Sequence, residues 1–139
     1  MASFDPSLEL QAVIRARLIA SPELMELVPP DNVLDVTGRP ERMPAVIIGE
    51  GQTLYGEFSA TTTAVLHVWF QEPGLKQAKQ AVGAIVGAVR VDAQRDGALR
   101  MPSFIVHDMS ADRTQFLRDP HGPFSHAVVT VSAIVQEAE

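Results

Sequence analysis

Two segments with strict apolar alternation constrain the fold of this chain most strongly. In residues 126–139, HAVVTVSAIVQEAE, apolar side chains occupy every second position from Ala127 to Val135. Residues 61–71, TTTAVLHVWFQ, show the same period of two, with apolar side chains on both faces. This period places alternate side chains of a strand on one face of a sheet. We therefore predict two long strands, and we expect the first to be central or covered on both faces.

The segment between these strands predicts the clearest helix of the chain, over residues 73–92. Apolar residues recur there at helical spacing: Leu75, Ala78, Val82, Ile85, Val86 and Val89. Gly83 and Gly87 lie four residues apart on another face. Each glycine costs about 1 kcal/mol relative to alanine in a helix interior. The pair therefore indicates a close approach, either to the chain's own sheet or to a neighbouring subunit.

A helix pair is predicted at the N terminus, because a cap followed by proline occurs twice. Asp5 precedes Pro6, and Ser21 precedes Pro22. Asp and Ser are favoured N-caps, and proline suits the first helical position. The first helix then presents one apolar stripe, which consists of Leu10, Val13, Ile14 and Leu18.

The remaining pattern predicts short strands and loops. Strands are expected over residues 32–36, 45–50 and 103–113, and a hairpin-like excursion over residues 51–60. Residues 93–102 and 114–125 are predicted to be connections, since they carry glycine and proline turn formers. The order of elements predicts an α+β fold in a single domain over residues 1–139. We expect a mainly antiparallel sheet with the N-terminal helix pair and the long helix packed on one face.

Composition narrows the classes of function. The chain has no cysteine, which excludes disulfides, thiolate metal sites and a cysteine nucleophile. The net charge is −6, and no basic run supplies the clustered cations that tight nucleic-acid binding needs. Apolar runs are short, so we expect no membrane span, and the first residues lack the pattern of a signal peptide.

The residues that could support catalysis form no recognised motif. His121 and His126 are five apart across a Gly-Pro turn, and neither HExxH nor HxH occurs. Ser125 precedes His126, but neighbours on a strand point to opposite faces. Asp108 and Asp112 could share a strand face, where solvated carboxylates are commoner than acid–base pairs. We predict no catalytic, metal or cofactor site; the alternative is a small metal-dependent hydrolase that uses His121 and His126.

Candidate contact surfaces lie in the predicted loops. Tyr55 and Phe58 fall in the glycine-flanked excursion, and apolar loop residues often mark contact surfaces. The alternative is that the loops fold back and bury them. A second candidate is the mixed charged and aromatic group at the end of the predicted strand 103–113 and in the connection after it: Arg113, Phe116, Arg118 and Asp119.

The ordered set of these features resembles the small tail-completion or tail-terminator proteins of long-tailed phages and related gene-transfer particles. The resemblance rests on four segments, in order: LELQAVIRARLIASPELMELV, RMPAVIIGE, TTTAVLHVWFQEPGLKQAKQAVGAIVGAV and RDPHGPFSHAVVTVSAIV. It covers nearly the whole chain and is one of pattern, since no invariant catalytic motif anchors it.

The resemblance implies a homo-oligomeric ring, a hexamer in that family, which caps the tail tube and joins it to the head-side connector or stopper. It implies the major tail tube protein and the connector as partners, with DNA only in transit through the channel. It also implies a place in the tail–neck region of the virion and synthesis in the cytoplasm of a bacterial host. Gly83 and Gly87 are then candidates for a subunit contact. The alternative is another neck protein, such as a connector or stopper.

Overall fold

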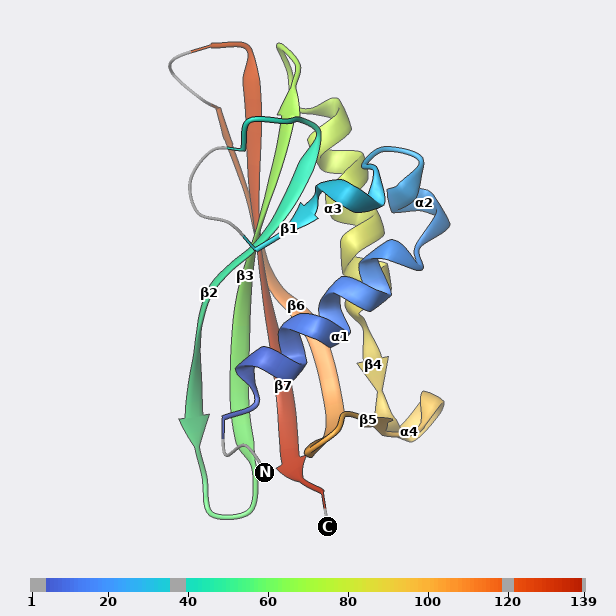
Figure 1. The fold of residues 1–139 in the computed structure, drawn as a ribbon, viewed down its shortest axis with the longest axis vertical. Coiled ribbons are helices and arrows are strands. Elements are labelled where there is room, and N and C mark those ends of the chain that lie inside the picture. The colour runs from blue at the N-terminus through green and yellow to red at the C-terminus, as the bar shows by residue number, and fades with distance from the viewer. Residues whose placement is uncertain (1–4, 36–39, 119–121, 139) are drawn as a thin grey trace.

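The structure, a computed structural model, describes residues 5–35, 40–118 and 122–138. Its described residues form a curled sheet of seven strands in the order β1-β2-β3-β7-β6-β4, with β5 also paired to β6. Only β1 and β2 are parallel. The strands are β1 (Val33–Leu34), β2 (Ala45–Tyr55), β3 (Ala60–Gln71), β4 (Val91–Asp92), β5 (Leu99–Arg100), β6 (Phe104–Arg118) and β7 (Phe124–Glu137). The predicted mixed fold with a mainly antiparallel sheet is confirmed (Figure 1).

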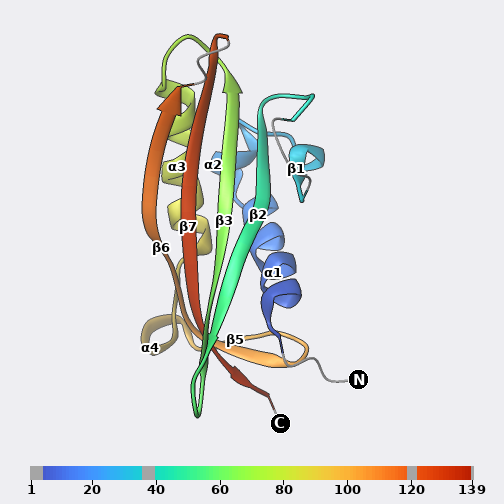
Figure 2. The ribbon, with the colours of Figure 1, turned by 90° about the vertical axis from the view of Figure 1, so that its left-hand side faces the viewer.

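The helices lie against one face of this sheet. They are α1 (Ser7–Ile19), α2 (Pro22–Met25), α3 (Lys76–Val89) and α4 (Ala93–Asp96), with a 3-10 helix, η1 (Pro30–Asn32). Figure 2 shows α1 behind β2 and β3, and α3 behind β6 and β7. Among the described residues, no helix lies on the opposite face.

Local caps explain where the N-terminal helices begin. The backbone N–H of Ser7 donates to Asp5 Oδ1 at 3.0 Å, so the carboxylate satisfies one free donor of the first turn. The N–H of Leu24 likewise donates to Ser21 Oγ at 3.3 Å. Helix α1 begins at Ser7, one residue after the predicted start, with Pro6 as the flanking residue.

The core follows the predicted alternation. The inward side chains of β3 and β7 are buried against α1 and α3, and they are Leu66, Val68, Phe70, Ala127, Val129, Val131, Ala133 and Val135. The outward side chains of β3, from Val65 to Trp69, are only half-buried. Strand β3 is therefore central as predicted, but the described residues cover only one of its faces with helices. Val86 also departs from the predicted buried stripe, since its side chain is exposed on α3.

Strands β2 and β6 are longer than predicted. Strand β2 continues through Tyr55 because residues 51–55 pair with 60–64 of β3. Strand β6 continues to Arg118, so residues 114–118, which were expected in a connection, pair with 125–129 of β7. Register shifts between Ile48 and Gly51, and at two places in β6, break the period of two and hide these strands in the sequence. The predicted connection over residues 93–102 contains α4 and β5.

Candidate protein interfaces

The turn between β2 and β3 carries an exposed aromatic surface. The side chains of Tyr55 and Phe58 are 64% and 80% exposed, and Leu54 is 63% exposed. The turn is closed by the N–H of Gly56, which donates to the carbonyl of Ser59 at 2.8 Å. The alternative that this loop folds back and buries its aromatic residues is therefore wrong. Beside the turn lies an open groove of about 380 Å³, which Phe58 and the end of β7 line.

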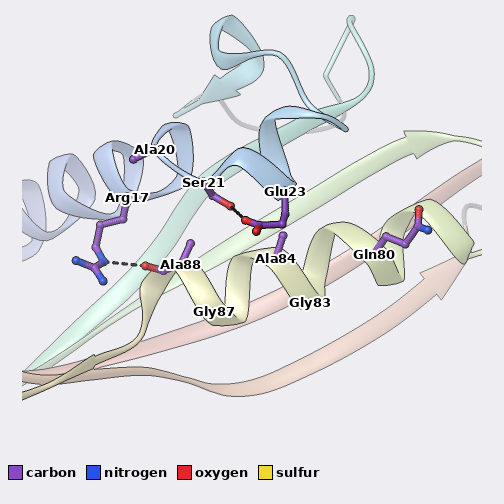
Figure 3. A pocket seen from close by; sticks show the side chains of 9 residues that line it. All are labelled: Arg17, Ala20, Ser21, Glu23, Gln80, Gly83, Ala84, Gly87 and Ala88. Carbon is purple, nitrogen blue, oxygen red and sulfur yellow. Dashed lines mark hydrogen bonds between the residues drawn. The ribbon is translucent and has the colours of Figure 1, made fainter. Parts of the chain in front are cut away.

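A second surface is the groove between the α1–α2 pair and α3, shown in Figure 3. It has a volume of about 710 Å³, and Gly83 and Gly87 lie on its α3 side. A Cβ atom added at either glycine would have no heavy atom within 4 Å. The prediction of a close approach to the chain's own sheet is therefore wrong, and both glycines are open to another molecule.

Arg17 fixes one wall of this groove. Its guanidinium donates to the carbonyl oxygens of Ala88 at 2.7 Å and Arg90 at 3.0 Å (Figure 3 shows the first bond). Carbonyls at the end of a helix have no partner within the helix, and they favour a positive charge. Arg17 thus ties α1 to the C-terminal end of α3, and this sets the width of the groove.

The predicted charged and aromatic rim is divided between the two faces of the sheet. Arg113 is exposed on the outward face, opposite Thr130. Phe116 is half-buried on the helix side, where Lys79 Nζ lies 5.6 Å from its ring centroid, a cation–π contact. The backbone of Arg118 pairs with β7. Asp119 lies outside the described residues, as does His121. The expectation that Arg113 and Phe116 form one rim is wrong, because they lie on opposite faces of β6.

Sequence reasoning missed a contact between two histidines on the outward face. His67 Nδ1 and His126 Nε2 are 2.9 Å apart, and His67 Nε2 lies 2.6 Å from Glu50 Oε1. The ring of His126 stacks on that of Trp69, with centroids 4.0 Å apart and an angle of 8° between the planes. The contact joins β2, β3 and β7. Its only sequence signal was that each histidine occupies an outward position of a strand, since the register that brings them together is a tertiary property.

One of the two histidines of the enzyme alternative, His121, lies outside the described residues. The described residues contain no cluster of three or more His, Cys, Asp or Glu side chains that could hold a metal ion. Ser125 is buried and donates to Glu72 Oε1 at 3.0 Å, so it faces away from His126 as predicted. Glu72 also accepts the backbone N–H groups of Gln77 and Ala78, and thereby caps α3. The hydroxyl of Ser132 donates a hydrogen bond to the carboxylate of Asp112 on the outward face.

The third surface is the outward side of β3, β7 and β6, which we call the open face. Its apolar side chains are Val65, Leu117, Val128 and Ile134, and its acidic side chains include Asp108 and Asp112. Ile134 is 43% exposed and Leu117 is 40% exposed.

No helix in the described part of the chain is long and apolar enough to cross a membrane.

The fold defines a two-layer protein of mixed α and β structure with three candidate contact surfaces. The family model described as "Tail completion protein gp17" matches residues 12–136. Because this match spans most of the chain, the protein belongs to the tail completion protein gp17 family, a family of structural proteins of phage tails. The resemblance stated from the sequence is thereby confirmed.

A solved structure supports the same fold. A chain in the structure described as "Virion of native gene transfer agent (GTA) particle" superposes with a TM-score of 0.79 at 21% sequence identity. The likeness covers 98% of this chain and 100% of that chain. A search of curated proteins gives no significant match.

Proposed function

We propose that the protein is a tail terminator: a single-domain, non-enzymatic subunit of a ring, most simply a hexamer, at the junction of tail and head. One side of the ring stops polymerisation of the tail tube, and the other receives the head-side connector or stopper. DNA crosses the channel. The protein is made in the cytoplasm of the bacterial host and ends in the neck of the virion.

The observation that carries this proposal is the family match over residues 12–136. The surfaces are consistent with it, because a closed ring needs two different contact patches on each subunit, and docking to the tube and connector needs others. The groove at Gly83 and Gly87 and the open face can supply the first kind. The Tyr55–Phe58 turn can supply the second kind. A net charge of −6 suits a channel that should not retain DNA.

The test is the behaviour of the purified protein with its tail tube protein. Native mass spectrometry and negative-stain imaging should show rings of uniform size, and the rings should bind one end of the tube. Removal of the gene should give tubes of uncontrolled length or tails that do not join heads. A particle that stays monomeric at high concentration, even with tail tube protein present, would contradict the proposal. Rings that bind only the connector would instead place the protein elsewhere in the neck.

A further inference from the structure

The open face carries several apolar side chains among its polar ones. An antiparallel sheet with one face in water normally places polar residues on that face. Here the outward positions of β3 and β7 include Val65, Trp69, Val128 and Ile134. Leu117 and Ile134 are the most exposed apolar side chains of this face, and the described residues place no helix over them, so they can contact a second molecule.

The charged side chains on and beside the open face are mostly acidic. Asp108 and Asp112 are exposed on β6, and Glu50 extends from β2 toward His67. Among the described side chains of β3, β6 and β7, Arg113 is the one arginine or lysine that faces outward. The partner that fits such a surface combines apolar side chains with positive charge.

The exposed side of α3 has that complementary character. Helix α3 contains no Asp or Glu, and it carries both lysines of the chain, Lys76 and Lys79, on its exposed side. Arg90 follows at its C-terminal end, and Val86 is exposed among these charges. Gly83 and Gly87 leave room for a partner to approach the helix backbone closely.

We propose that the open face of one copy receives the exposed side of α3 from the next copy. The two layers of the subunit present unlike surfaces on opposite sides, the sheet on one and the helix on the other. Contact between unlike patches is heterologous, and it closes into a ring when the rotation permits. Layers of sheet and helix then alternate around the ring. This inference rests on the proposed ring and specifies the contact that builds it.

Charge reversal tests the contact. Lys76→Glu/Lys79→Glu and Asp108→Lys/Asp112→Lys should each raise the concentration at which rings dissociate by roughly tenfold or more. The four changes together restore the original net charge and should recover much of the assembly. Glu26→Lys/Asp31→Lys, at exposed sites away from both surfaces, adds the same charge as the aspartate reversal and should leave assembly unchanged. Circular dichroism confirms that each variant is folded.

Crosslinking provides a second measurement, because the chain has no native cysteine. A Val86→Cys/Ile134→Cys variant treated with a short bis-maleimide should give a ladder of covalent multimers up to the ring size. The variant with only Val86→Cys and the variant with only Ile134→Cys should give no ladder. If the wild-type protein forms rings and the charge-reversal variants form them at the same concentration, the proposed contact is wrong although the ring stands. Strong covalent dimers from the variant with only Ile134→Cys would likewise contradict the contact and not the ring. A wild-type protein that never forms rings would overturn both.

Discussion

Replacing both exposed glycines of α3 with alanine should separate folding from assembly. Neither Gly83 nor Gly87 has a positive φ, and an added Cβ would meet nothing within 4 Å. Alanine in a helix interior is favoured over glycine by about 0.8–1.0 kcal/mol, so Gly83→Ala/Gly87→Ala should stabilise the isolated subunit by about 2 kcal/mol. With an unfolding entropy of about 2.1 cal/mol/K per residue over the 139 residues, Tm should rise by roughly 5–7 °C.

The assay is thermal unfolding by circular dichroism at a concentration where the protein is monomeric, followed by mass measurement at high concentration. If α3 contacts a neighbour closely, the two added methyl groups should weaken assembly although the subunit is more stable. An unchanged or lower Tm would refute the conclusion that the glycines are open in the monomer. A higher Tm with unchanged assembly would refute their role in a subunit contact.

Three further substitutions test the packing. Gly51→Ala should lower the free energy of unfolding, measured in urea, by more than about 2 kcal/mol, because the new Cβ would lie 2.0 Å from the carbonyl oxygen of Thr63. A loss of less than about 0.5 kcal/mol would contradict this geometry. His126→Ala removes the ring stacked on Trp69 and should cost about 1–2 kcal/mol, with a shift in the emission of this sole tryptophan; unchanged fluorescence would argue against the stacking. Arg17→Ala should lower the free energy of unfolding by about 1.5–3 kcal/mol and increase hydrogen exchange at the end of α3. Arg17→Lys should keep only part of this stability. Full stability in the alanine variant would show that the hydrogen bonds of Arg17 are not needed.

The helices and the two most regular strands could be predicted from local signals. The Asp5-Pro6 and Ser21-Pro22 pairs predicted the starts of α1 and α2 to within a residue, because Asp5 and Ser21 accept hydrogen bonds from neighbouring backbone N–H groups. The alternation in β3 and β7 predicted their buried faces correctly. Strand β6 was predicted only in part, because two register shifts interrupt its alternation and only pairing with β7 shows its full length.

The candidate surfaces were predicted less well than the fold. Exposure of Tyr55 and Phe58 was one of two alternatives, and the structure decided it. The unusual pair Gly83 and Gly87 was noted from the sequence, but one of its two explanations, an approach to the chain's own sheet, was wrong. A helical pattern predicts which way a residue points and does not predict what lies beside it. Arg113 and Phe116 were expected to form one rim, and strand pairing put them on opposite faces of β6.

The sequence by itself determined the classes of element, the buried faces of β3 and β7, and the resemblance to tail-completion proteins, because all of these depend on residue patterns along the chain. Only the tertiary structure decided that the described helices all lie on one side of the sheet, and that His67 meets His126 across neighbouring strands. Contacts of this kind depend on register and on the packing of layers. Both arise from interactions between residues that lie far apart in the sequence.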